Sequence, residues 1–143
     1  MEPDKKIVEA KELNDGKQDG FSEGYHENGQ LMWKGNWKDG KRVGLWERYY
    51  PNGQVDSTGN YKDGKLDGLW ENYYKNGQLW FKSNWKDGEL DGLWEEYYEN
   101  GQLKHKGNYK NYKEGKKEGL WEYYDEEGNL TKTEGYKDGV LHQ

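Results

Sequence analysis

The side chains of this sequence that come closest to a chemical site are carboxylates grouped around glycine. Asp63 and Asp67 flank one Gly-containing segment, and Asp87, Glu89 and Asp91 flank the next. Oxygen atoms of this kind are calcium ligands, but the twelve-residue calcium loop with its terminal glutamate is absent. Asp and Gly also tolerate the backbone angles of tight turns. We therefore interpret these carboxylates as turn residues and predict no metal site and no cofactor.

A glutamate recurs through the chain, at Glu23, Glu47, Glu71, Glu95 and Glu122. Paired carboxylates could serve a glycosidase, but a residue that recurs at every repeat is expected to be structural. The chain has no cysteine and three histidines, and no Ser-His-Asp arrangement, phosphate-binding loop or zinc-ligand spacing is visible. We predict a protein without enzymatic activity, in which these glutamates accept hydrogen bonds from tyrosine hydroxyls or turn amides, because an unpaired buried carboxylate is costly.

Aromatic side chains are the most informative group, because the chain has eight Trp and thirteen Tyr. The candidate partner-binding residues form a stripe on one face of the expected sheet: Trp46, Tyr50, Trp70, Tyr74, Trp80, Trp94, Tyr98 and Trp121. A large exposed apolar patch on a polar protein indicates an interaction surface. In the alternative interpretation the rings only cover their own sheet and stack on lysine side chains. The sequence leaves both interpretations open.

The composition restricts the class of protein. Lys and Arg number 22 against 28 Asp and Glu, and the resulting charge of −6 disfavours nucleic acid and anionic lipid as partners. No run approaches the roughly 20 apolar residues of a membrane helix, and the first residues lack the apolar stretch of a signal peptide, so we expect a cytoplasmic protein. Leu, Ile, Val and Phe together number 19, so the core must be largely aromatic.

A repeat of 24 residues organises nearly all of the chain after residue 14. Four copies follow one another without a gap, a fifth carries three extra residues near Asn111, and a sixth begins at Asp138. The predicted organisation is an N-terminal segment, 1–14, and a repeat array, 15–143. The array divides into 15–38, 39–62, 63–86, 87–110, 111–137 and a partial copy, 138–143.

Each copy predicts one β-hairpin. It contains an Asn-Gly and an Asp-Gly turn signal, separated by short runs in which Trp and Tyr alternate with polar residues. Five copies predict an all-β fold, an elongated single-layer antiparallel meander of about ten strands. Residues Lys5 to Leu13 are predicted to form a short helix that caps the first hairpin, because repeat arrays need caps at their ends.

Loop length decides which side chains share a face. We predict three-residue loops at both kinds of turn, which pair Tyr97 with Leu103 and Trp85 with Glu89. A two-residue Asp-Gly loop would place Leu93 on the side opposite to its expected neighbours. With an uninterrupted pleat, the predicted core face carries Leu93, Glu95, Tyr97, Leu103, His105, Gly107 and Tyr109. Trp70 and its counterparts are then displayed on the other face.

The recurring pattern Gly-x-Tyr/Trp-Lys-Asp-Gly-Lys-x-x-Gly-Leu-Trp-x-x-Tyr-x-x-Asn-Gly resembles MORN repeats, with Gly59 to Trp70 as a clear example. It is most similar to the bacterial variant described as YwqK-type antitoxin-like. The resemblance spans roughly residues 15–143 and implies an elongated sheet of stacked hairpins that serves as a scaffold for protein contacts. The sequence departs from the pattern at Ser22, which replaces a Trp, and at the insertion near Asn111.

The sequence leaves three functions open. The first is a protein-binding module, such as an antitoxin or immunity protein that covers a basic toxin, since opposite charges would steer the encounter. The second is a scaffold that associates with membrane phospholipid, for which a basic cluster is missing. The third comes from a distant similarity to choline- or glycan-binding repeats, whose aromatic cages hold quaternary amines.

Overall fold

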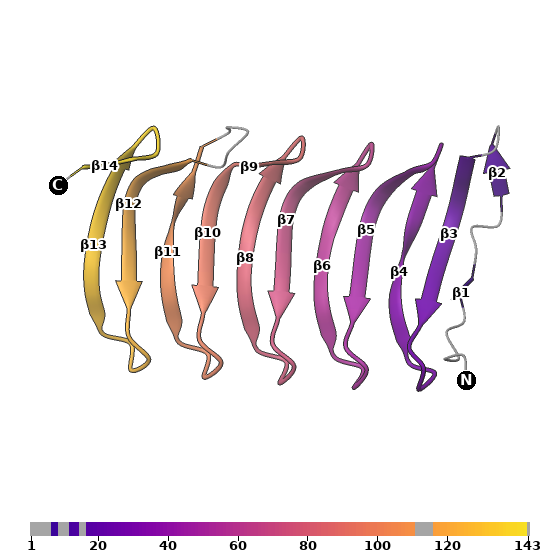
Figure 1. The fold of residues 1–143 in the computed structure, drawn as a ribbon, viewed down its shortest axis with the longest axis horizontal. Helices are drawn as coiled ribbons and strands as arrows, with labels where there is room; N and C mark the ends of the chain where they lie inside the picture. Colours follow the sequence, from indigo (N-terminus) through magenta and orange to yellow (C-terminus); the bar gives the residue numbers. More distant parts are fainter. Residues whose placement is uncertain (1–6, 9–11, 15–16, 111–115, 143) are drawn as a thin grey trace.

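The computed structural model describes residues 7–8, 12–14, 17–110 and 116–142, and it shows one open antiparallel sheet (Figure 1). Twelve strands follow one another across the sheet in chain order, and β2 and β9 pair beside this path with β3 and β8. The bounds are β1 Ile7–Val8, β2 Glu12–Asn14, β3 Lys17–Tyr25, β4 Leu31–Lys38, β5 Lys41–Tyr49, β6 Val55–Lys62, β7 Lys65–Tyr73, β8 Leu79–Lys86, β9 Glu89–Leu90, β10 Gly92–Tyr97, β11 Leu103–Tyr109, β12 Lys117–Tyr124, β13 Leu130–Lys137 and β14 Val140–His142. The predicted all-β meander of hairpins is confirmed.

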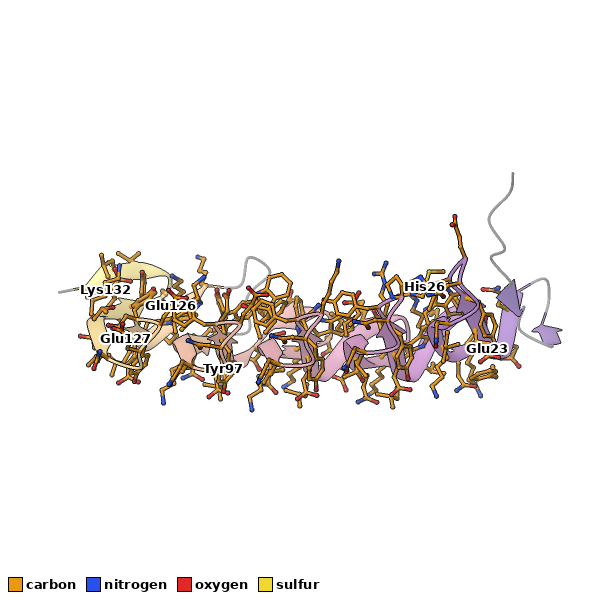
Figure 2. All side chains as sticks on the ribbon, turned by 90° about the horizontal axis from the view of Figure 1, so that it is seen from below. Glu23, His26, Tyr97, Glu126, Glu127 and Lys132 are labelled. Atoms are coloured by element: carbon orange, nitrogen blue, oxygen red, sulfur yellow. The ribbon has the colours of Figure 1, made fainter. Side chains whose placement is uncertain are left out.

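The sheet forms a single layer. Figure 2, which looks along the strands, shows side chains on both sides of one row of strands. Within the described residues, no second layer of strands or helices covers either side. Both faces must therefore be stabilised by side chains that pack on their own sheet.

The N-terminal segment pairs with β3 instead of forming the predicted helix. Ile7 and Val8 lie opposite Gly24 and Glu23, and β2 pairs with the start of β3. The helix prediction is wrong for these residues, and its remaining part, at 5–6 and 9–11, lies outside the described residues. An open edge such as that of β3 offers unpaired N–H and C=O groups, and short strands satisfy part of it.

The Asp-Gly turns have two residues, and the predicted three-residue loop is wrong there. Asp87 and Gly88 have φ angles of 50° and 83°, and Trp85 lies opposite Leu90 rather than Glu89. Asp-Gly favours this mirror-image turn because its twist matches the twist of the two strands. Leu93 consequently lies on the face opposite to that of Trp85.

The Asn-Gly turns have the predicted three-residue loops. Tyr97 lies opposite Leu103, and the backbone N–H of Tyr98 donates to the carbonyl oxygen of Gln102 at 2.8 Å. Gly101 takes the left-handed conformation, with a φ of 93°. The predicted pairing at this turn is confirmed.

A bulge after each Asn-Gly turn reverses the faces of the second strand. In β11 the extra residue is Lys104, because Tyr97 lies opposite Leu103 while Glu96 lies opposite His105. One inserted residue turns every following side chain to the other side of the sheet. The predicted core face therefore combines residues from both faces, since His105, Gly107 and Tyr109 lie on the face opposite to that of Leu103.

A second bulge, at a glycine, follows the Asp-Gly turns at 39–40, 63–64 and 87–88, and a glycine of the same kind lies in β12. Gly44, Gly68, Gly92 and Gly119 have φ angles of 72°, 95°, 112° and 76°. Around Gly44 the register changes by two residues, because Val43 lies opposite Asn36 while Glu47 lies opposite Lys34. An even shift keeps the alternation of faces unchanged and moves the next large ring over the neighbouring strand.

The two faces have different compositions. The tryptophan face carries the Trp column together with the glycines, serines and rings opposite it, namely Trp46, Trp70, Trp94, Trp121, Gly35, Gly59, Ser83, Gly107, Trp37, Tyr61, Trp85, Tyr109 and Tyr136. The glutamate face carries the Leu, Glu and Tyr columns that begin at Phe21, Glu23 and Tyr25, with Leu31, Val55, Leu79, Leu103 and Leu130 beside the Tyr column.

Candidate functional site

The Trp column forms the core of the protein. The indoles of Trp46, Trp70 and Trp121 each lie over a glycine on the preceding strand, and a Cβ atom added to Gly107 would lie 2.1 Å from the Trp121 ring. The rings also contact their neighbours along the sheet, as with the edge-to-face pair of Tyr109 and Trp121 at 5.2 Å and the stacked pair of Phe81 and Trp94 at 4.9 Å. Such contacts stabilise an aromatic layer beyond the burial of area alone.

The prediction that the Trp column is displayed is wrong. Trp46 and Trp121 are 7% and 1% exposed, and Trp70 and Trp94 are partly buried. The physical reason is the two-residue Asp-Gly loop, as at Asp87 and Gly88, which puts the Trp on the same face as the ring before the loop. The glycine bulge then places the indoles of Trp46, Trp70 and Trp121 over glycines of the adjacent strand. These four rings are used in holding the sheet together.

The predicted tyrosines join successive hairpins. The hydroxyl groups of Tyr50, Tyr74 and Tyr98 donate to the backbone carbonyl oxygens of Tyr73, Tyr97 and Tyr124, with a distance of 2.6 Å for Tyr74 and 2.7 Å for Tyr98. Each acceptor belongs to the next hairpin along the chain. These tyrosines therefore connect adjacent repeats, and all three are partly buried.

Trp80 differs from the other seven candidate residues because it is 37% exposed. It is the extra residue of the bulge that follows an Asn-Gly turn, and its ring stacks on Tyr74 at 5.4 Å. Its indole N–H donates to Glu96 Oε2 at 3.3 Å.

Two of the aromatic clusters already contain a cation of the chain itself. The Arg42 guanidinium lies 4.7 Å from the Trp46 ring centroid and 5.4 Å from that of Tyr61. At the matching position of a later repeat, the Lys117 ammonium lies 4.7 Å from Trp121. These cation–π contacts occupy the places that an aromatic cage would offer to a quaternary amine.

The glutamate face is held by hydrogen bonds and ion pairs. The hydroxyl of Tyr97 donates to Glu95 at 3.1 Å, and the same tyrosine-to-glutamate hydrogen bond occurs in the other repeats at Tyr25, Tyr73 and Tyr124. Lys82 lies 3.3 Å from Glu95 across the strands. The predicted tyrosine partner of the recurring glutamate is confirmed, although the column lies on the partly exposed face rather than in the core.

An exposed hydrophobic row crosses the glutamate face near the Asp-Gly turns. We call it the leucine ridge, and it consists of Phe21, Leu45, Leu69, Leu93 and Leu120, which are 38% to 58% exposed. An asparagine lies directly opposite each of the first four, namely Asn36, Asn60, Asn84 and Asn108. The ridge is thus a periodic row in which apolar side chains alternate with amides.

The sequence prediction missed the leucine ridge because it placed these leucines in the core. The signal that could have found it is the Gly-Leu-Trp order in each repeat, as in Gly68, Leu69 and Trp70. A glycine inside a strand marks a bulge, and Asp-Gly favours a two-residue turn. Together they would have placed the Trp in the core and the Leu outside.

Titratable groups on the tryptophan face are used in packing. Burial lowers the pKa of His105, and the Glu96 carboxylate at 3.4 Å opposes this shift only in part. Burial also raises the pKa of Tyr123, with a further contribution from its hydrogen bond to Glu134.

Within the described residues, no three His, Asp or Glu side chains are grouped so that they could hold a metal ion. Nor do those residues contain a helix with the length and apolar character needed to cross a membrane.

A known protein family matches this chain. The model of the MORN repeat variant matches residues 42–63, 66–87, 90–111 and 117–138. Each matched segment begins just after an Asp-Gly turn or, in the last case, at Lys117 at the start of β12. A search of curated proteins gave no match.

Proposed function

This chain belongs to the MORN repeat variant family, and we propose that it acts as a protein-binding module without enzymatic activity that docks its partner on the leucine ridge. The observation that carries the proposal is the periodic exposure of the ridge leucines. Alternate strands of a sheet lie about 10 Å apart, so successive hairpins present the same apolar side chain at regular steps. Exposed apolar patches of this kind support protein contacts.

The ridge and not the Trp column is the proposed docking surface. Trp46 and Trp121 are buried, so a partner could reach them only after the aromatic layer had opened. Leu69 and Leu93 are exposed without any such change. The amide groups of Asn60 and Asn84 beside them supply the polar contacts that fix orientation in an interface.

The net charge of the chain favours a basic partner. Beside the ridge, a row of five glutamates, from Glu23 to Glu122, faces three lysines, namely Lys34, Lys82 and Lys106. The chain as a whole carries a charge of −6. Complementary potential speeds association and selects against acidic competitors. A basic toxin that this protein neutralises is the specific partner that we propose.

The test of the ridge uses matched variants on the two faces. Purified wild-type protein, Leu69→Ser/Leu93→Ser and Trp80→Ser would be used to capture partners from the source cells, and the captured protein would be purified and titrated by calorimetry. Leu93 and Trp80 are 38% and 37% exposed, so the variants remove similar exposed groups from opposite faces. We expect the ridge variant to lose the partner and Trp80→Ser to keep it.

Circular dichroism would establish that the ridge variant is folded. Binding that survives the ridge substitutions, or that is lost only in Trp80→Ser, would contradict docking on the ridge. Co-expression with the captured protein then tests the antitoxin role: growth should be inhibited by the partner alone and restored by the wild-type chain. A partner that is harmless to the cell would exclude the antitoxin role, but the proposal of a protein-binding module would still hold.

A further inference from the structure

The tryptophan face contains a hollow of about 500 Å³ that spans β4 to β7. Ser57, which is 4% exposed, is part of its lining, at a position where three other repeats carry the larger side chains Trp33, Phe81 and His105 and the fifth carries Lys132. Phe81, for example, fills its place by stacking on Trp94 at 4.9 Å. The small side chain of Ser57 therefore fills less of this space than Trp33, Phe81 and His105 fill in their own repeats.

Aromatic rings form the walls of this hollow. Trp33 and Trp46 lie on one side and stack on each other at 5.8 Å, and Tyr61 and Trp70 lie beyond Ser57 with a centroid distance of 6.5 Å. A volume of this size is within the range of small-molecule sites, which are mostly apolar with a few polar groups. The walls suit a flat ring, because aromatic groups stack on one another.

Both arginines of the chain, Arg42 and Arg48, border the hollow. Arg42 is held in place by its cation–π contacts and by a hydrogen bond of 3.2 Å from its Nη1 to the Tyr61 hydroxyl. Arg48 lies directly opposite Ser57 and is exposed. Among the described residues, the Arg48 side chain has no hydrogen bond or ion pair, so its planar set of donors is open to a ligand.

The charge at the hollow selects an anion. Glu47 also borders it, but its side chain belongs to the glutamate face, where the carboxylate pairs with Lys34 at 3.5 Å. Two guanidinium groups would repel a cationic ligand, whereas guanidinium binds carboxylate and phosphate through paired hydrogen bonds. This local charge is opposite in sign to the charge of the chain as a whole.

We propose that the hollow binds a small molecule in which a flat ring carries a carboxylate or phosphate group. The ring lies among the indoles over Ser57, and the anionic group pairs with the Arg48 guanidinium. Arg42 strengthens the positive potential and keeps the rings around it in place. This site is on the face opposite to the leucine ridge and is independent of the proposed protein partner.

The test is calorimetric titration of the full chain with matched pairs of probes. Adenosine monophosphate and indole-3-acetate carry a ring and an anion, and adenosine and indole-3-acetamide carry the ring alone. Inorganic phosphate and acetate supply the anion alone. We expect at least one of the two anionic ring compounds to bind about tenfold or more tightly than its neutral partner and its free anion. The pair that binds identifies the anion as phosphate or carboxylate.

Three variants locate the binding. Arg48→Gln should weaken it by about tenfold or more. Ser57→Phe copies the residue found at Phe81 and should abolish it by filling the space. Lys132→Gln removes an exposed cation from the matching position of β13, far along the sheet, and should leave binding unchanged.

Two results would overturn the proposal. One is that neither anionic ring compound binds the wild-type chain more tightly than its neutral partner. The other is binding that Arg48→Gln and Ser57→Phe leave intact in protein shown to be folded by circular dichroism. Leu69→Ser/Leu93→Ser should bind the probes as the wild type does. The proposed docking on the ridge and the proposed ligand site in the hollow can therefore be contradicted separately.

Discussion

At the scale of single residues, Trp121 and Trp80 show how one residue type serves two purposes in this sheet. Trp121 is 1% exposed and covers Gly107, whereas Trp80 is 37% exposed. Trp121→Ala should cost about 3–5 kcal/mol of unfolding free energy, because it leaves a cavity in the aromatic layer. Trp80→Ala should cost about 1 kcal/mol or less. Urea unfolding followed by circular dichroism measures both, and equal losses would contradict this division of roles.

Gly107 is a position where the absence of a side chain decides the packing. A Cβ atom there would lie 2.1 Å from the Trp121 ring, so Gly107→Ala must displace the indole. We expect a loss of about 1–3 kcal/mol in urea unfolding, typical of overpacking. Gly135→Ala is the control, since its added Cβ would meet only the His142 carbonyl oxygen at 3.5 Å. The prediction fails if the two variants are equally stable.

His105 makes the stability of the protein depend on pH. Its pKa is lowered by burial, so as the pH falls below about 6.5 the unfolded chain takes up a proton at this site before the folded chain does. Stability should therefore be lost as the pH falls from 7 to 5. His105→Phe, which copies Phe81, should remove this part of the loss. Urea midpoints measured across the pH range for both proteins test it, and parallel curves would contradict the assignment to His105.

At the scale of elements, the sequence was enough to predict the hairpins but not which side chains share a face of the sheet. Asn-Gly and Asp-Gly predicted where each hairpin turns, and Tyr97 does lie opposite Leu103. A single bulge residue, Lys104, then exchanges the faces of the side chains that follow it in the strand. A lysine is not a residue type that predicts a bulge. Because alternation has a period of two, one such residue exchanges the core and the surface.

The same reversal explains the outcome for the candidate site. The eight aromatic residues were found from their spacing, and the recurring Trp does define a continuous column. The face on which this column lies depends on the length of the Asp-Gly loop, which is two residues at Asp87 and Gly88 rather than three. The hollow at Ser57 could not be predicted, because an open space depends on the ring positions of several strands at once.

Hairpins are joined by hydrogen bonds that run from one loop to the next. The Tyr74 hydroxyl donates to the Tyr97 carbonyl oxygen at 2.6 Å, across the junction of β8 and β10. Tyr74→Phe should cost about 0.5–1.5 kcal/mol and should speed hydrogen exchange of the β10 amides bonded to β8. Tyr73→Phe removes a hydroxyl whose partner, Glu71, is in its own hairpin, so it should leave this exchange unchanged. Equal exchange in the two variants would show that the loop contact does not join the repeats.

At the scale of the whole molecule, the single layer gives the protein two separate working surfaces. The leucine ridge crosses one face, and the arginine-bordered hollow opens on the other. The recurring Trp column and the small residues beneath it hold the strands together, so the residues beside the column are free to differ between repeats, as Ser57 and Phe81 do. In a repeat protein each unit contacts only its neighbours, and a change in one repeat leaves distant ones intact.

The open sheet should also be recognisable in solution by its shape. Twelve strands side by side, each spaced by about 4.8 Å, give a flat body whose radius of gyration we estimate at about 19 Å. A compact domain of this chain length would have a value of about 14.5 Å. Small-angle X-ray scattering at several concentrations, extrapolated to zero, measures the radius for the monomer. A value near that of a compact domain would mean that the sheet folds back on itself and covers one face, and the ridge or the hollow would then be closed to its ligand.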